Sequence, residues 1–263
     1  MNNFLFPDLL KSAINFIIGY CIGRALEKFG NYIYVRQPLV KLLGTILFRK
    51  RYVVIVIPRL YSHSKRMFKN PIDTSEFITW RESNSLFAEG DSFALMHIYN
   101  LLIKAGKSVN EIKIKSDMEV TGEDKRGDII CIGAGSNKIT KEFLTKLNPP
   151  INFEQSKLPI GLEIFGTAIF DRISNRRWSS NRVYDYGLIM KLKNPYNIDA
   201  SILILAGLGT SATAATGYSL FHNWREIYNI IRMKKCFDKN FIIIIRVKQN
   251  DYTDIFIEKV FCY

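Results

Sequence analysis

Short runs of β-branched and other apolar residues recur along this chain, and stretches with helical periodicity separate most of them. Runs of this length predict strands that are buried on both faces. Buried strands that alternate with helices favour an α/β fold, in which a largely parallel sheet is covered by helices on both sides. Because 48% of the 263 residues are hydrophobic, the chain is also long and apolar enough to exclude disorder throughout.

We predict strands over residues 52–57, 111–115, 128–132, 158–173, 188–192, 201–206, 241–247 and 255–261. We predict helices over residues 91–105, 138–147, 211–220 and 224–233. The short polar segment that joins the last two strands predicts an antiparallel pair at one edge of the sheet. The predicted fold is a doubly wound, mostly parallel, Rossmann-like α/β domain over residues 51–263, preceded by a separate N-terminal segment, residues 1–50.

The net charge of +13 is concentrated near the N-terminus. Residues 1–70 hold twelve Lys and Arg against Asp8 and Glu27, whereas the remaining residues hold 25 basic and 22 acidic side chains. The apolar stretch 13–22 precedes most of these basic residues, which is typical of a membrane helix whose C-terminal side faces the cytoplasm. We therefore expect a membrane-associated or interaction helix with a basic linker, a cytoplasmic α/β domain, and no nucleic-acid partner.

The predicted helix 9–28 leaves three arrangements open. Lys11 and Arg24 are separated by only twelve residues, fewer than the roughly 20 that a membrane span needs. The helix could span with both charges at the interfaces, lie among the lipid headgroups, or pack on the soluble body. Gly19 and Gly23 lie on one small or polar stripe of the helix, so they predict a homo-oligomer through close helix contact.

The cysteines and histidines carry no recognisable site. Without a C-x-x-C pair, we interpret the cysteines as reduced structural thiols. No histidine has metal-ligand spacing with a cysteine, so we predict neither a metal site nor a bound cofactor. The residues are Cys21, Cys131, Cys236 and Cys262, with His63, His97 and His222.

Two glycine-containing turns follow predicted buried strands and precede predicted helices. At such turns, helix N-termini present free N–H groups that bind anions. The second turn satisfies G-x-G-x-x-A, but no acidic residue follows at the spacing of the NAD fingerprint, and the chain has no P-loop. The alternative is that both are only tight connections. The predicted ligand-binding residues are Gly133, Gly135, Ser136 and Asn137 in the first turn, and Gly207, Gly209, Thr210 and Ser211 in the second.

An arginine-rich segment could supply positive charge to such a ligand. Arg176 and Arg177 lie beside Trp178, between Arg172 and Arg182. Arginine forks bind phosphate in a bidentate manner, and an aromatic plane can stack on a base. We therefore add Arg176 and Arg177 to the predicted ligand site, while a solvated loop remains the alternative.

Candidate catalytic residues are few. His63 lies between two serines, which brings an imidazole close to hydroxyl groups. Glu82 and Glu89 flank a polar stretch and could approach a sugar as general base or nucleophile. The alternative for both glutamates is a solvated position ahead of a helix.

Three segments carry a resemblance to a known group of domains. They are DIICIGAGSNKIT (128–140), DYGLIMKLKNP (185–195) and LILAGLGTSATAA (203–215). With the preceding hydrophobic helix, they resemble the Rossmann-like domains of bacterial nucleotide-signalling and conflict systems, the SLOG, CARF and TIR-like group. The resemblance implies sensing or cleaving a nucleotide-derived ligand near a membrane. Neither the SLOG glycine signature nor the TIR glutamate motif aligns, which favours a sensor over an enzyme.

Three functions therefore remain open from the sequence. The first is a membrane-tethered domain that binds a nucleotide-like or other phosphorylated anion as a sensor or signalling module. The second is a nucleotide-directed hydrolase, similar to an N-glycosidase or NADase, with Glu82 or Glu89 as the acidic residue. The third is a non-catalytic interaction protein.

Overall fold

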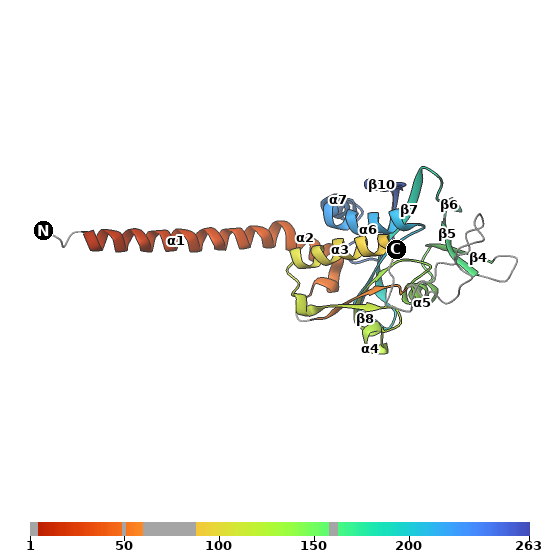
Figure 1. The fold of residues 1–263 in the computed structure, drawn as a ribbon, viewed down its shortest axis with the longest axis horizontal. Coiled ribbons are helices and arrows are strands. Elements are labelled where there is room, and N and C mark those ends of the chain that lie inside the picture. The colour runs from red at the N-terminus through yellow and green to blue at the C-terminus, as the bar shows by residue number, and fades with distance from the viewer. Residues whose placement is uncertain (1–4, 49–50, 60–87, 158–162) are drawn as a thin grey trace, which may run out of the picture.

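The computed structural model describes residues 5–48, 51–59, 88–157 and 163–263. A long N-terminal helix projects from a body that contains two sheets and several shorter helices (Figure 1). The elements in chain order are α1 (Leu5–Asn31), a π-helical turn (Tyr32–Arg36), α2 (Gln37–Leu43), a 3-10 turn (Gly44–Leu47), β1 (Val53–Ile57), α3 (Glu89–Lys104), a 3-10 turn (Val109–Glu111), β2 (Ile112–Ser116), α4 (Gly122–Arg126), β3 (Asp128–Ile132), α5 (Lys138–Leu147), β4 (Ile151–Lys157), β5 (Glu163–Asp171), β6 (Arg176–Trp178), β7 (Tyr184–Asn194), β8 (Asn197–Gly207), α6 (Thr210–His222), α7 (Trp224–Met233), β9 (Phe241–Lys248) and β10 (Asp251–Cys262).

The main sheet has seven strands in the order β10-β9-β7-β8-β3-β1-β2. The four strands β2, β1, β3 and β8 are parallel neighbours, and this parallel core is consistent with a Rossmann-like domain. Strand β7 is antiparallel to both β8 and β9, and β10 is antiparallel to β9. The predicted α/β class and the antiparallel C-terminal pair are confirmed, but the sheet is only partly parallel.

The difference from the predicted sheet comes from the connection between β7 and β8. Only Pro195 and Tyr196 separate the two strands, and Asn194 pairs directly with Asn197 across the turn. A connection this short can join only antiparallel neighbours, because a parallel pair needs a crossover of a dozen or more residues. Strand β7 therefore runs opposite to β8. It lies between β8 and β9 in the sheet and is antiparallel to both.

A second, three-stranded antiparallel sheet is formed by β4, β5 and β6. The sequence prediction assigned a single strand to residues 158–173 and no strand to residues 151–157 or 176–178. Ile151, Phe153, Ile169 and Trp178 are buried against one face of the main sheet, so this small sheet covers part of it.

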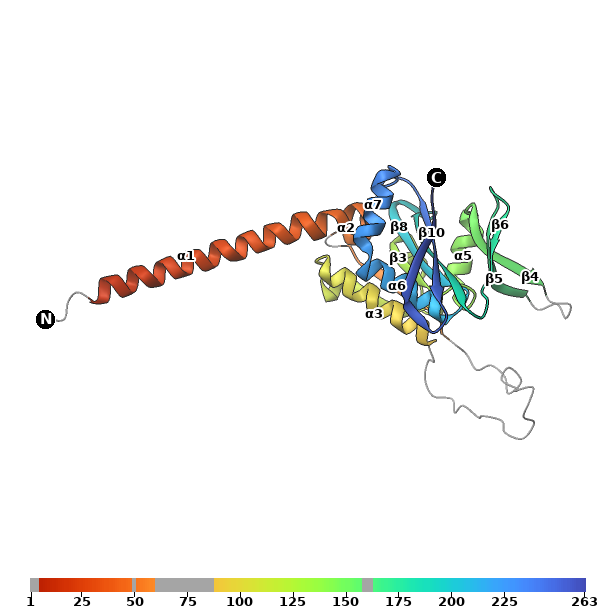
Figure 2. The same cartoon turned by 90° about the horizontal axis from the view of Figure 1, so that it is seen from above.

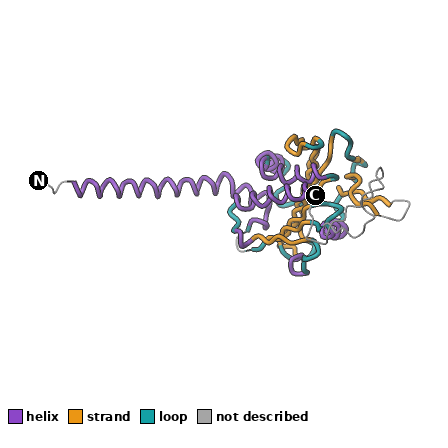
Figure 3. Tube along the Cα trace, in the orientation of Figure 1, coloured by secondary structure: helices purple, strands orange, loops and turns teal. Residues whose placement is uncertain are grey.

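The core lies on both faces of the main sheet. Helices α3, α6 and α7 pack on one face, while α5 and the small sheet cover the other (Figures 2 and 3). Alternate side chains of each central strand reach opposite sides, which explains the nearly continuous apolar runs in the sequence. All five side chains of β1 and all five of β3 are buried.

Helix α1 confirms the predicted N-terminal helix but does not pack on the body. The side chains of residues 14–28 are exposed, among them Phe16 and Leu26. Among the described helices, none is long and apolar enough to cross a membrane. Chain segments after α1 do join the core, since Leu39, Leu42 and Leu43 of α2 are fully buried.

One cysteine prediction is wrong. Cys236 and Cys262 form a disulfide, although the sequence was interpreted as holding only reduced thiols. The two residues are 26 positions apart, and the folding of β10 back along β9 brings them together. Cys21 is exposed and free, while Cys131 is buried and free.

Candidate ligand sites at the two edges of the sheet

The parallel strands all begin on one side of the main sheet and all end on the opposite side. We call the side where β1, β3 and β8 end the carboxyl edge, and the side where they begin the amino edge. Neither name refers to the outermost strands, β10 and β2. Both predicted glycine turns lie at the carboxyl edge on neighbouring strands, and the Gly133 N–H donates to the Leu205 carbonyl at 2.9 Å. The two turns are therefore adjacent. An anion can bind there only where N–H groups at the starts of α5 and α6 have no acceptor within the protein.

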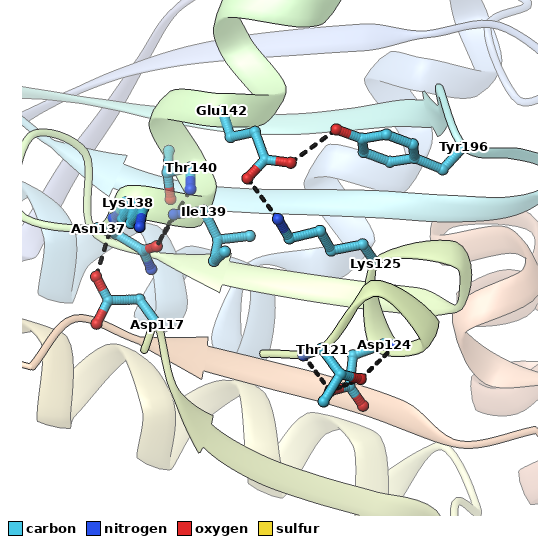
Figure 4. A network of polar contacts seen from close by, with 10 residues as sticks. All are labelled: Asp117, Thr121, Asp124, Lys125, Asn137, Lys138, Ile139, Thr140, Glu142 and Tyr196. Atoms are coloured by element: carbon cyan, nitrogen blue, oxygen red, sulfur yellow. Dashed lines mark hydrogen bonds and ion pairs between the residues drawn. The ribbon is translucent and has the colours of Figure 1, made fainter. Parts of the chain in front are cut away.

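The N-terminus of α5 is filled by side chains of the protein itself (Figure 4). The Asn137 Oδ1 atom accepts from the N–H groups of Ile139 and Thr140 at 3.0 and 3.1 Å. The N–H of Lys138 donates to the Asp117 carboxylate at 3.0 Å. Asn137 also donates to two strand carbonyls and is fully buried. Three first-turn amides of α5 thus already have internal acceptors, one of them anionic.

Helix α5 is fixed along its length as well. Glu142 accepts from Lys125 at 2.6 Å and from the Tyr196 hydroxyl at 2.7 Å (Figure 4). These contacts tie the helix to α4 and to the β7–β8 turn. The carboxylate pKa of Glu142 is lowered overall, because these two hydrogen bonds and the Lys125 charge outweigh the opposing effect of burial, the largest single contribution.

At the N-terminus of α6, a carboxylate accepts from one first-turn amide. Asp185 of β7 accepts from the Ala212 N–H at 3.2 Å, and its other oxygen accepts from the Ser180 hydroxyl. A Cβ on Gly209 would lie 2.6 Å from the same carboxylate, and one on Gly207 would lie 2.4 Å from the Thr213 nitrogen. These two glycines therefore allow close packing of β8, α6 and Asp185.

A third carboxylate, in the first turn of α3, lies next to the glycine turn after β3. Asp91 is 4% exposed, and its Oδ1 atom would lie 3.2 Å from a Cβ on Gly133, whose φ of +86° favours glycine. Among the described residues, the Asp91 Oδ2 atom has no hydrogen-bond partner. Burial raises the pKa of this carboxyl to about 6. The carboxyl edge is thus lined internally by acidic side chains.

Helices α3 and α6 are parallel neighbours, and their N-termini touch at the carboxyl edge. A Cβ on Gly90 would lie 2.1 Å from the Thr210 carbonyl oxygen, so only glycine fits there. Beside this contact lies a pocket of about 270 Å³. It brings together the predicted residues Glu89, Thr210 and Ser211. The full lining is Glu89, Gly90, Phe93, Thr210, Ser211, Ala214, Asn250 and Tyr252.

The carboxyl-edge pocket is polar without being basic. None of the described residues that line it is a lysine, arginine or histidine. Phe93 and Tyr252 stack with ring centroids 5.1 Å apart and form an aromatic wall. The Ser211 hydroxyl oxygen accepts from the Asn250 N–H at 3.2 Å, which fixes the β9–β10 turn against α6. Hydroxyl, amide and carboxylate groups therefore surround an aromatic surface.

The predicted arginines lie elsewhere, on the small sheet. Arg177 pairs with Glu154 at 2.7 Å, and Arg176 lies 4.0 Å from Glu258 and stacks over Trp178. Neither side chain lines the carboxyl-edge pocket. Their positive charge is thus matched by acidic side chains of the same surface.

Two of the predicted catalytic residues, His63 and Glu82, lie outside the described residues. Gly135 is partly exposed and Ser136 is exposed in the turn after β3. No group of three or more candidate metal ligands occurs among the residues that the structure describes.

A second pocket, of about 350 Å³, lies at the amino edge next to α2. The sequence patterns did not predict this pocket, although a lysine inside the apolar run of residues 188–192 indicates a buried basic side chain. Lys191 is 8% exposed and donates to the Phe237 carbonyl at 3.0 Å. The described lining includes four lysines and one acidic residue, namely Lys41, Lys191, Lys193, Lys239 and Asp238.

Comparisons with known proteins do not assign the chain to a family. No known protein family matches the sequence, and no curated protein does.

Proposed function

We propose that the α/β domain binds a nucleoside-like ligand in the carboxyl-edge pocket, as the recognition part of a sensor or signalling protein. The pocket chemistry supports this proposal. A carboxylate such as Glu89 can accept hydrogen bonds from ribose hydroxyls, as acidic residues do in dinucleotide-binding proteins. Asn250 and the hydroxyls of Thr210 and Ser211 supply further donors and acceptors, and the Phe93–Tyr252 wall suits a base.

One observation carries the choice of a neutral ligand group over a phosphate. Asp117 and Asp185 already accept from first-turn amides of α5 and α6, and the described residues that line the pocket include Glu89 but no basic side chain. A phosphate at this position would face the Glu89 carboxylate with no cation among the described lining residues, which is unfavourable at short range. The pocket is also slightly smaller than the range of roughly 300–1,000 Å³ typical of larger ligands.

Ligand-induced thermal stabilisation of the full chain tests the proposal. We expect adenosine or guanosine to raise Tm, and Glu89→Gln to weaken that binding about tenfold or more, because a hydrogen bond to a charged group is lost. Glu123→Gln, an exposed change on α4, is the matched control and should bind like the wild type. Stabilisation by none of the nucleosides, or equal binding by Glu89→Gln, would overturn the proposal.

A hydrolase acting on the same ligand is the second candidate, because Glu89 lines the pocket. A carboxylate beside a bound sugar can act as a general base or nucleophile at a glycosidic bond. Release of free base by the purified chain, lost in Glu89→Gln and retained in Glu123→Gln, would support this function. Binding without base release would support the sensor instead.

A further inference from the structure

Helix α1 exposes apolar side chains in every direction. Phe16, Ile17 and Ile18 are consecutive, so successive turns of 100° point them to three different sides of the helix. Their side chains are 76, 59 and 51% exposed. Ile22 and Leu26, further along, are also more than half exposed. Apolar side chains exposed on several sides of a helix are typical of a surface that another protein or lipid covers.

A second copy of the chain would cover this helix only in part. A pair of helices buries one stripe of each, and side chains on the opposite side stay in water. Lipid acyl chains, in contrast, can surround the apolar residues. Arg24, Glu27 and Lys28 interrupt the apolar surface toward the body. Arg24 lies 3.4 Å from the Glu27 carboxylate, and the long Lys28 side chain can extend to lipid phosphates.

The amino-edge pocket lies at the base of this helix. Val40 and Lys41 of α2 line it, and α2 continues from α1 through one π-helical turn. Gly44 adopts a φ of +65°, and a Cβ there would lie 3.2 Å from the Lys191 Cε atom. The absence of a Cβ at Gly44 thus makes room for the Lys191 side chain in the pocket wall.

The pocket combines positive charge with apolar surface. Its four lysines face a single acidic lining residue, Asp238, so the described lining has a net positive charge. Phe48 and Ile198 line the same pocket and are 44 and 72% exposed. A phosphate attached to hydrocarbon would satisfy both parts of such a surface, whereas a free phosphate would use only the lysines.

We propose that the amino-edge pocket binds the phosphate of a membrane phospholipid, and that α1 and this pocket together dock the protein on an anionic lipid surface. Helix α1 inserts its apolar residues among the acyl chains, and no helix has to cross the bilayer. The docking places the carboxyl-edge pocket at the opposite edge of the sheet, away from the lipid.

Vesicle co-sedimentation of the full chain tests this proposal. We expect binding to vesicles of phosphatidylcholine with phosphatidylglycerol and much weaker binding to phosphatidylcholine alone. The double variant Lys193→Gln, Lys239→Gln should bind the anionic vesicles about 25-fold more weakly, since each basic residue at such a surface contributes about fivefold. Both lysines are exposed, so unchanged circular dichroism and Tm are expected.

The matched control is Lys138→Gln, Lys248→Gln, which removes the same charge from the carboxyl edge. This control should bind the anionic vesicles nearly as the wild type does. Equal loss in both double variants, or equal binding to both kinds of vesicle, would overturn the headgroup site. A chain that forms dimers in solution and binds neither vesicle would assign α1 to a second copy. Stabilisation by inorganic phosphate through Lys193 and Lys239, without vesicle binding, would assign the pocket to a soluble phosphate.

Discussion

The two edges of the main sheet differ in the charge that they present. At the carboxyl edge, Asp117 and Asp185 occupy helix N-termini, Asp91 is buried nearby, and the pocket residues that the structure describes include Glu89 and no basic side chain. At the amino edge, four lysines line a pocket with one aspartate. The positive ends of the helix dipoles are thus matched internally, while side-chain charge creates a positive site at the other edge.

The contrast shows that the sheet topology determines where a site lies, whereas the surrounding side chains determine which ligand fits it. The parallel core brings the predicted turns together at the carboxyl edge, as such folds do in general. Whether amides there are free for a ligand depends on acceptors that come from distant strands. A glycine turn at a helix start therefore predicts a position more reliably than it predicts an anion.

The largest expected effect concerns the packing of the carboxyl edge. Gly90→Ala places a methyl group 2.1 Å from the Thr210 carbonyl oxygen, so α3 and α6 must separate. We expect a loss of about 3 kcal/mol in unfolding free energy, measured by urea denaturation. Gly122→Ala on α4 meets no atom within 4 Å and serves as the control. Similar stability of both variants would show that the two helix N-termini are not in contact.

The second effect concerns the amino edge, where the Cys236–Cys262 disulfide closes the segment that carries Phe237 and Lys239. Replacing both cysteines by serine should cost about 3 kcal/mol, because the unfolded chain gains the freedom of the opened loop. Urea denaturation measures this loss, and Cys21→Ser, an exposed change, should have little effect. Four titratable thiols in the unfolded, unreduced protein would contradict the pairing; two are expected.

A smaller effect follows from Asp91 at the carboxyl edge. Burial raises the pKa of this carboxyl from 3.8 to about 6, so the folded state binds the proton more tightly than the unfolded state. Its stabilising contribution is complete below about pH 4 and is lost as the pH rises through 6. Asp91→Asn, which mimics the protonated form, should therefore stabilise the protein by up to about 3 kcal/mol at pH 8 and by little at pH 4.

Urea denaturation from pH 4 to pH 8 measures this dependence. Asp254→Asn, an exposed change on β10, is the control. A destabilising Asp91→Asn at pH 8 would mean that the carboxylate is charged and satisfied in the folded state. The carboxyl edge would then be more favourable to negative charge than we infer.

The sequence predicts much of the fold because buried strands leave a local signal. The runs of β1, β3, β8 and β9 are apolar and β-branched, and each forms a strand of the main sheet. The direction of β7 was not predicted, although the two-residue connection at Pro195–Tyr196 contains the information. The small sheet was missed in part because β4, with Glu154 and Gln155, lacks a continuous apolar run.

The candidate sites depend on contacts that no local pattern records. Glu89 lines one pocket with Thr210 and Ser211 because α3 and α6 are parallel neighbours, which follows only from the completed sheet. Asp117 and Asp185 look like ordinary polar residues next to strands until their partners on α5 and α6 are known. A lysine in a buried strand, as at Lys191, was the one local signal left unused.

The most direct test of the contrast between the edges is NMR mapping of the full chain during titration with glycerol phosphate, a soluble mimic of a lipid headgroup. We predict shifts of the backbone amides of Lys191, Lys193 and Lys239 at the amino edge, with little change at Ile139 and Ala212. Shifts confined to Ile139 and Ala212, at the starts of α5 and α6, would contradict the account, because the phosphate would then displace the carboxylates that fill those sites.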